Sequence, residues 1–240
     1  MAVASLAGRT AVVTGASRGI GAAVASALAA AGARVALLAR SESLLNELAL
    51  RIGARTLPVI CDVTDAGSVA RAADLVREQF GSAPDILVNN AGLFQIKPIA
   101  DIEPEEFAET IQTNLVAPFF IIRQFLPAMY SRSTGDIVTI GSSADRNIFP
   151  GNGAYAASKF GARAFHEVLR AETRSTGVRA TLVSPSGVDT GLWDNVRFMD
   201  SDASPDRTRM IQPAAVADAV LFAVTQPPEI TVDELRMSRS

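Results

Sequence analysis

The chain has 240 residues, 48% of them hydrophobic, and a formal net charge of −3 at pH 7. This apolar fraction suffices for a folded core and excludes a disordered chain, and the weak negative charge argues against a general electrostatic grip on nucleic acid. The one cysteine, Cys61, excludes an intrachain disulfide framework and suits a reducing compartment. There is no signal-peptide pattern and no run of about 18 strongly apolar residues. We therefore expect a cytoplasmic protein that binds neither nucleic acid nor membrane.

Short β-branched segments alternate with longer segments of helical periodicity along the whole chain. We predict strands at Thr10–Thr14, Arg34–Leu38, Thr56–Ile60, Asp85–Val88, Asp136–Ile140 and Val178–Val183. We predict helices at Gly19–Ala31, Glu42–Ile52, Ala66–Phe80, Pro104–Arg132 and Ala154–Ser175, then a helix at about Pro213–Thr225 and a last strand at Glu229–Leu235. This alternation predicts a doubly wound, Rossmann-like α/β fold with a parallel sheet. Without a linker or repeat, residues 1–240 should form one domain.

A glycine-rich turn, Thr14-Gly-Ala-Ser-Arg-Gly-Ile-Gly21, follows the first predicted strand. In an open parallel sheet, ligands bind beyond the carboxyl ends of the strands. Glycines at 15, 19 and 21 let the backbone approach a ligand closely, and the next helix presents its N-terminal N–H groups to a phosphate. The spacing differs from the common G-x-G-x-x-G pattern, but the strand before it and the helix after it favour a phosphate-binding turn over a plain one.

The end of the second predicted strand, Leu37-Leu-Ala-Arg40, indicates which dinucleotide would bind. Dinucleotide folds that use NAD place an acidic residue here, on the ribose 2′-hydroxyl. This chain has Ala39 and Arg40, with Arg18 in the glycine turn. Two guanidinium groups suit a 2′-phosphate, so the pattern favours NADP(H) over NAD(H). The alternative is that both arginines are surface charges, and Glu42 lies close to them in sequence.

Two further strand ends carry polar side chains: Asn89-Asn-Ala-Gly92 and Gly141-Ser-Ser143. Asparagine, glycine and serine are also ordinary turn and cap residues. Each motif is therefore ambiguous alone and gains meaning from the helix predicted after residue 153.

Tyr155 and Lys159 lie on that helix and are one of two tyrosines and one of two lysines in the sequence. Positions i and i+4 share a helix face, so the phenol and the ammonium can reach one ligand. A nearby cation lowers the pKa of a phenol from about 10, which makes it a usable proton donor or acceptor near neutral pH. Taken alone, the pattern could be an accidental pair on a solvated helix face.

In this order, the four strand-end motifs and Tyr155-x-x-x-Lys159 resemble the single-domain form of the short-chain dehydrogenase/reductase family, from Thr10 to about Leu235. The resemblance implies that Tyr155 is the catalytic acid/base and that Lys159 binds the nicotinamide ribose and lowers the Tyr155 pKa. It implies that Ser142 orients the substrate oxygen and that Asn114 supports a water-linked proton path. With Arg40, the implied NADP(H)-binding residues are Gly15, Ser17, Arg18, Gly19, Ile20, Asp62, Val63, Asn89, Asn90, Ala91, Gly92, Tyr155, Lys159, Pro185, Val188 and Thr190.

Two segments depart from the family pattern. Pro185-Ser-Gly187 replaces the usual Pro-Gly, so Ser186 must adopt a positive φ or the turn must differ. The C-terminus lacks the glycine-rich end typical of β-ketoacyl carrier-protein reductases, and it is more similar to the branch with 3-hydroxy acid dehydrogenases and clavulanate-type aldehyde reductases.

The remaining candidates concern the substrate side. His166, the only histidine, has no acid or cysteine cluster around it, so we predict no metal site. A loop at about 187–212 contains the only tryptophan, and the resemblance implies that it closes over the substrate; ordinary packing is the alternative. Leu93, Phe94 and Phe149 would add an apolar wall, while Arg146 and Arg197 would meet an acidic substrate or simply be solvated.

These observations predict an NADP(H)-dependent oxidoreductase that interconverts a small ketone or aldehyde and its alcohol. A β-ketoacyl thioester reductase and a non-enzymatic dinucleotide-binding protein are the alternatives. The resemblance further implies a homotetramer or homodimer that pairs through the helices at 104–132 and 154–175.

Overall fold

A seven-stranded parallel sheet forms the centre of the molecule, in the order β3-β2-β1-β4-β5-β6-β7. The computed structural model describes residues 5–194, 196 and 206–240. The strands are β1 Thr10–Thr14, β2 Arg34–Ala39, β3 Thr56–Ile60, β4 Ile86–Asn89, β5 Gly135–Ile140, β6 Val178–Pro185 and β7 Glu234–Met237. The chain crosses from one half of the sheet to the other between β3 and β4, which places a topological switch point between β1 and β4. The predicted doubly wound α/β fold is confirmed.

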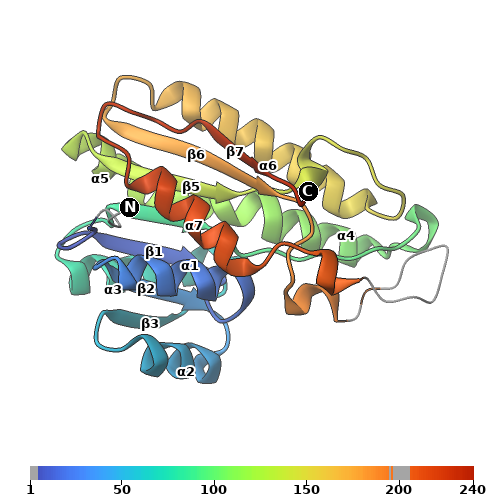
Figure 1. The fold of residues 1–240 in the computed structure, drawn as a ribbon, viewed down its shortest axis with the longest axis horizontal. Helices are drawn as coiled ribbons and strands as arrows, with labels where there is room; N and C mark the ends of the chain where they lie inside the picture. The colour runs from blue at the N-terminus through green and yellow to red at the C-terminus, as the bar shows by residue number, and fades with distance from the viewer. Residues whose placement is uncertain (1–4, 195, 197–205) are drawn as a thin grey trace.

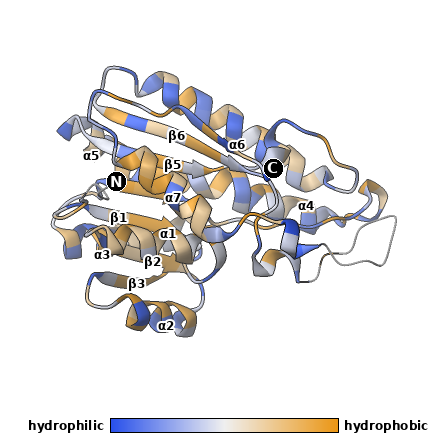
Figure 2. Cartoon of the chain, in the orientation of Figure 1, coloured by the Kyte–Doolittle hydropathy of each residue, from blue (hydrophilic) through white to orange (hydrophobic). Residues whose placement is uncertain are grey.

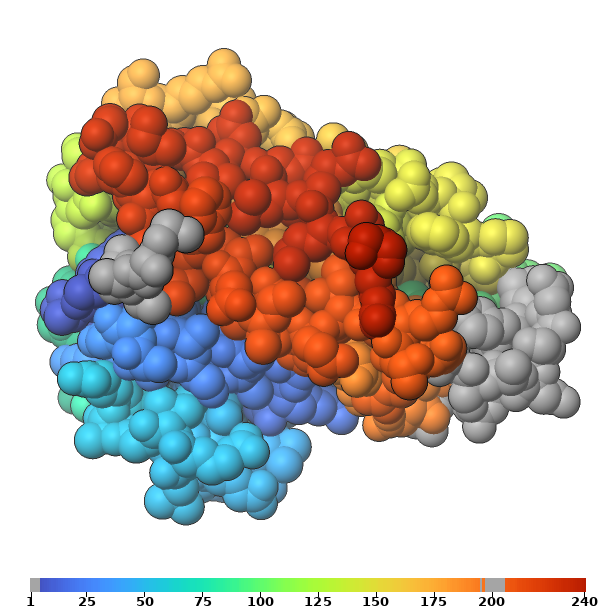
Figure 3. All heavy atoms as spheres, viewed as in Figure 1, coloured from blue at the N-terminus to red at the C-terminus, as the bar shows by residue number. Residues whose placement is uncertain are grey.

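Helices cover both faces of the sheet (Figure 1). The helices α1 Gly19–Ala30, α2 Glu42–Ile52 and α7 Pro213–Val224 contribute to one hydrophobic core. On the other face, α3 Ala66–Phe80, α5 Ala117–Arg132 and α6 Gly153–Glu172 contribute to a second core, and α4 Pro104–Ile111 packs on α6. C-terminal segments lie directly against the N-terminal ones on the face shown in Figure 3, where α7 packs on α1.

The strands are apolar along nearly their whole length because both faces of the sheet are covered. Val12 and Val13 are neighbours in β1, yet Val12 belongs to the core under α3 and α5 and Val13 to the core under α1 and α7. Side chains alternate across a strand, so a buried parallel strand needs apolar residues at every position. Figure 2 shows the same pattern, with hydrophobic strands and more mixed outer helices.

The helix predicted at 104–132 is two α-helices joined by a π-helical turn. α4 ends at Ile111, a five-residue π-helical turn spans Gln112–Val116, and α5 begins at Ala117. Pro118, in the first turn of α5, has no N–H to donate to the carbonyl four residues earlier, that of Asn114, so the α-helical hydrogen-bond pattern changes here. A wider turn at this point accommodates the ring.

The last strand was predicted at 229–235, but β7 begins only at Glu234. The preceding segment is held elsewhere, because the carbonyls of Pro227 and Ile230 accept hydrogen bonds of 2.9 and 2.8 Å from the guanidinium of Arg179. These residues therefore form a turn instead of extending the sheet edge.

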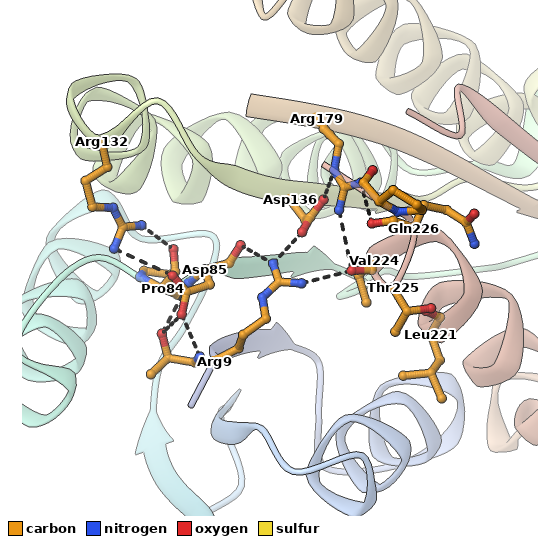
Figure 4. Close-up of polar contacts among 12 residues, drawn as sticks. Arg9, Pro84, Asp85, Arg132, Asp136, Arg179, Leu221, Val224, Thr225 and Gln226 are labelled. Atoms are coloured by element: carbon orange, nitrogen blue, oxygen red, sulfur yellow. Dashed lines mark hydrogen bonds and ion pairs between the residues drawn. The ribbon is translucent and has the colours of Figure 1, made fainter. Parts of the chain in front are cut away.

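An arginine–aspartate network lies at the end of the sheet where the strands begin (Figure 4). Asp136, at the start of β5, forms ion pairs with Arg9 and, at 2.7 Å, with Arg179. Arg9 also donates a 2.8 Å hydrogen bond to the carbonyl of Val224, the last residue of α7. The network joins the first strand, the middle of the sheet and the end of the last helix.

No helix in the described part of the chain is both long enough and apolar enough to cross a membrane. The predicted site lies at the opposite end of the sheet, where the strands end.

Candidate active site

A cavity of about 840 Å³ opens at the carboxyl ends of the strands. This volume lies within the range of small-molecule and cofactor sites. Of the predicted site residues, its lining includes Gly15, Ser17, Arg18, Gly19, Ile20, Arg40, Asp62, Val63, Asn90, Ala91, Gly92, Ser142, Tyr155, Lys159, Pro185, Val188 and Thr190. Asn89 and Asn114 are not part of the lining. Another hollow of about 830 Å³, between α1 and α2, is lined mainly by alanines and contains no acid or base other than two arginines.

The glycine turn is packed so tightly against itself and the strand-end segment at 90–91 that Gly15 and Gly21 have no room for a side chain. A Cβ on Gly21 would lie 2.3 Å from the Gly15 carbonyl oxygen, and one on Gly15 would lie 2.8 Å from the Ala91 Cα. Gly15 and Gly19 have φ angles of 63° and 57°, which favour glycine. The Asn90 amide donates to the Thr14 carbonyl at 2.9 Å and holds the two loops together.

The N-terminus of α1 faces this cavity and its backbone N–H groups have no side-chain cap. The N-cap residue Arg18 makes no capping hydrogen bond, and the first turn contains no acidic residue. Backbone donors at a helix N-terminus bind phosphate groups. The turn and helix together therefore fit the diphosphate of a dinucleotide.

Two exposed arginines, Arg18 and Arg40, line this end of the cavity. Within the described ranges neither forms an ion pair. Hydrogen bonds from the hydroxyl and backbone of Thr64 lower the pKa of the neighbouring Asp62 carboxyl, and Arg40 contributes a smaller electrostatic effect in the same direction. The hydroxyls of Ser41 and Thr64 also line this end and were not predicted.

Asn89 does not line the cavity as predicted. β4 includes Asn89, so its side chain follows the strand alternation and points to the opposite face from that of Val88. It is buried, and neither its amide nitrogen nor its oxygen has a hydrogen-bond partner among the described residues. The predicted strand ended one residue too early to show this.

Tyr155 and Lys159 lie one turn apart near the start of α6 and both line the cavity. The Lys159 ammonium lies 5.7 Å from the centre of the Tyr155 ring and donates a 2.9 Å hydrogen bond to the Ile140 carbonyl at the end of β5. Ser142, two residues beyond that carbonyl, contributes a hydroxyl to the same wall and accepts from the Ala144 N–H at 3.1 Å. The structure thus brings these three predicted side chains together.

Burial dominates the acid–base properties of this pair. It raises the pKa of the Tyr155 phenol, and the Ser142 hydroxyl partly opposes this effect. It lowers the pKa of Lys159 to about 8. Both shifts have the same cause, because apolar surroundings disfavour the charged form of each group. That Lys159 lowers the Tyr155 pKa stays a prediction.

Asn114 lies in the π-helical turn, beside the cavity wall and not in it. Its amide donates 2.9 Å hydrogen bonds to the Leu93 carbonyl and to the Ser158 hydroxyl, and its side-chain oxygen accepts from the Leu93 N–H at 2.7 Å. Ser158 precedes Lys159 on α6. Asn114 therefore connects the strand-end loop at Leu93 to the helix that bears Tyr155.

A buried network behind Ser142 was missed in the sequence. The Asp145 carboxylate accepts a 2.6 Å bond from the Ser184 hydroxyl and a 2.6 Å bond from Arg146, which also forms an ion pair with Glu234 on β7. Arg146 was predicted to meet an acidic substrate or to be solvated, and it does neither. One partner, Asp145, precedes it in sequence, but Glu234 lies on β7, so no local sequence pattern indicates the complete pairing.

The substrate side of the cavity has an aromatic wall. Phe94 contacts the Tyr155 ring edge-on and the Trp193 ring at an angle of 59°, with centroids 4.7 Å apart in both pairs. The Trp193 indole N–H donates to the Val188 carbonyl at 2.9 Å. Arg197 and part of the predicted loop at 187–212 lie outside the described residues.

The unusual Pro185-Ser186-Gly187 turn has ordinary backbone geometry. Among the described residues other than glycine, only Ser133 and Ser175 have a positive φ. The Ser186 N–H donates to the Met237 carbonyl at 2.8 Å. Serine therefore fits this turn without strain, and Pro185 and Val188 remain in the cavity wall.

The chain is similar in sequence and fold to proteins named as oxidoreductases, reductases or dehydrogenases. The family model for short chain dehydrogenase matches residues 9–200. An uncharacterized oxidoreductase of Staphylococcus saprophyticus is 35% identical over 231 residues, which cover 95% of each chain. Glycine betaine reductase ATRR of Emericella nidulans is 36% identical over 236 residues, or 96% of this chain, but the match spans only 18% of that much longer protein.

Two solved structures add nucleotide complexes. A metagenomic short-chain oxidoreductase in complex with NADP has a TM-score of 0.84, with 35% identity and 98% of both chains covered. An alcohol dehydrogenase from Thermococcus sibiricus, complexed with 5-hydroxy-NADP, has a TM-score of 0.83, with 34% identity and 97% of this chain and 96% of that chain covered. The protein belongs to the short-chain dehydrogenase family.

Proposed function

We propose that this protein is an NADP(H)-dependent oxidoreductase that interconverts a ketone or aldehyde and the corresponding alcohol. The observation that carries the proposal is the arrangement of one cavity, in which Tyr155, Ser142 and Lys159 converge at one part and the uncapped helix α1 and two arginines line another. A bound nicotinamide supplies or accepts the hydride. The protein supplies position and a proton.

Tyr155 would exchange that proton with the substrate oxygen. A carbonyl that accepts a hydride develops negative charge on its oxygen, which hydrogen-bond donors stabilise. The hydroxyls of Tyr155 and Ser142 are two donors in this wall, and the raised pKa of Tyr155 keeps its phenol protonated for donation. In the oxidative direction Lys159 would assist deprotonation, since its pKa of about 8 lets it gain or lose a proton near neutral pH.

The cofactor would be held from several sides. The N–H groups at the start of α1 and the Ser17 hydroxyl would bind the diphosphate, and Lys159 would bind the nicotinamide ribose. Arg18 and Arg40, which are exposed and form no ion pair in the described ranges, would bind the 2′-phosphate that distinguishes NADP(H) from NAD(H). The NADP complexes of the two related structures support this assignment.

Binding and turnover test the proposal separately. Titration with NADPH and with NADH, followed by nicotinamide fluorescence, should show tighter binding of NADPH, and Arg40→Ala should reduce that preference at least tenfold. Tyr155→Phe should lower turnover of a ketone at least a hundredfold, the usual size of acid–base contributions, with NADPH affinity retained. Near-normal turnover in Tyr155→Phe would exclude the assigned role, and failure to bind either nucleotide would favour a non-enzymatic protein.

We also propose that copies of the chain associate through α4, α5 and α6. Phe107, Phe119 and Phe160 lie on these helices and are 43%, 45% and 41% exposed. Large apolar side chains gathered on one surface are typical of protein interfaces. Light scattering of the purified protein would measure the assembly, and a monomer at all concentrations would exclude it.

A further inference from the structure

We propose that the substrate is an uncharged carbonyl compound with an aromatic group beside the carbonyl, and that the site rejects carboxylates. This inference rests on the proposed function and names the substrate class for it. Two independent sets of contacts support the inference. One is the aromatic wall beside Tyr155, and the other is the pairing of described cations near this wall with carboxylates.

The aromatic wall presents ring surface and no free donor. Phe94 lies between Tyr155 and Trp193, in contact with both rings at 4.7 Å between centroids. The indole N–H, the only polar group of the Trp193 side chain, is already donated to the Val188 carbonyl. Leu93, Ile96 and Phe149 also line this part of the cavity. An aromatic substituent gains both apolar burial and edge-to-face contacts on such a surface.

Three described cations near this wall, Arg207, Lys97 and Arg146, are each paired with a carboxylate. Arg207 forms ion pairs of 2.5 and 2.7 Å with Asp189 and Asp194, which lie in the segment that carries Trp193. Lys97, which forms a β-bridge with the cavity residue Asn152, pairs with Glu106 at 2.6 Å.

Arg146 is likewise held between two carboxylates, Asp145 and Glu234. Lys159 is the one cation among the described residues that line this part of the cavity, and it already donates a hydrogen bond to the Ile140 carbonyl. A substrate carboxylate would therefore lose its hydration in an apolar pocket without a free partner in this described lining. By contrast, Arg18 and Arg40 form no ion pair in the described part of the chain, so the unpaired arginines of the described cavity lining lie at the proposed 2′-phosphate end.

Trp193 provides a binding signal that is independent of turnover, because it is the only tryptophan in the sequence and lines the cavity. We would titrate the Tyr155→Phe variant, saturated with NADP⁺, with 1-phenylethanol and with mandelate while following tryptophan emission. These ligands share the ring and the alcohol and differ by a methyl group against a carboxylate. The alcohol should bind at least tenfold more tightly.

Turnover of the matching ketones by the wild-type protein completes the test. With NADPH, kcat/KM for acetophenone should exceed that for benzoylformate at least a hundredfold, although the carboxylate-substituted carbonyl is the more electrophilic. Phe94→Leu should lower the preference for acetophenone over 2-butanone about tenfold.

Each outcome separates the substrate class from the proposed activity. Equal or tighter binding of mandelate, or efficient reduction of benzoylformate, would overturn the rejection of carboxylates. No emission change with either alcohol would overturn the aromatic site. Binding of 1-phenylethanol without reduction of acetophenone would support the substrate class and refute the oxidoreductase proposal.

Discussion

Replacing Asp136 by asparagine should destabilise the protein by about 3 kcal/mol. The Asp136 side chain is 7% exposed and is the shared partner of Arg9 and Arg179, whose side chains are 28% and 12% exposed (Figure 4). Removing one partner of a buried ion pair costs about 3–5 kcal/mol, because the remaining charge stays desolvated. We expect the lower end of this range, since both arginines keep backbone carbonyl acceptors, among them the Val224 carbonyl.

Urea denaturation followed by far-UV circular dichroism measures this loss, at one protein concentration because association changes apparent stability. A loss of about 3 kcal/mol corresponds to a fall in melting temperature of roughly 6–12 °C for a chain of this size. Asp74→Asn is the matched control, because its ion pair with Arg77 is exposed at the aspartate and should contribute under about 1 kcal/mol. If Asp136→Asn loses no more stability than Asp74→Asn, the buried network does not stabilise the fold.

Two further perturbations address the glycine turn and the buried histidine. Gly21→Ala should lower NADPH affinity at least tenfold, because the added Cβ would lie 2.3 Å from the Gly15 carbonyl oxygen and must displace the turn. Gly67→Ala, where a Cβ meets nothing closer than 3.4 Å, should leave that affinity unchanged. Burial lowers the pKa of His166 from 6.5 to about 4, so the unfolded chain binds its proton first as the pH falls. The free energy of unfolding that depends on neutral His166 is fully present above pH 6.5 and should be lost progressively towards pH 4. The total loss is about 3 kcal/mol, since a tenfold change in proton affinity is worth about 1.4 kcal/mol.

The contrary results are equally definite. Normal NADPH binding by Gly21→Ala would show that the turn can rearrange without loss of the site. For the histidine, unfolding free energies of the wild type and His166→Gln would be compared between pH 6.5 and pH 4. His166 is the only histidine in the sequence, so this variant removes the whole histidine contribution. Parallel curves for the two proteins would mean that His166 takes up its proton without unfolding.

Sequence alone predicted the order of strands and helices and most of the cavity lining. The strands were recognisable because a parallel sheet covered on both faces requires unbroken apolar segments. The glycine turn and the Tyr155–Lys159 pair were recognisable because their spacing is local: a few residues along one turn or one helix face determine which atoms can meet.

Features that depend on distant partners were not predictable in this way. Arg146 resembles a solvated side chain until β7 brings Glu234 beside it. Asn89 belongs to β4, one residue beyond the predicted end of that strand, and is buried outside the cavity lining. The pKa of Tyr155 depends on how completely the folded protein excludes water, which a four-residue spacing does not determine.

The network at Asp136 also constrains how the chain can fold as it is synthesised. Arg9 is made early, Asp136 near the middle and Arg179 later, while the carbonyl of Val224 that Arg9 binds is 215 residues further along the chain. Contacts of such large sequence separation form late, because a long loop must close first. On the ribosome, the first strand can pair with β2 well before its arginine can meet the end of α7. Arg9 therefore has no ion-pair partner in this network until Asp136 has emerged, and it lacks its acceptor at the end of α7 until almost the whole chain has emerged.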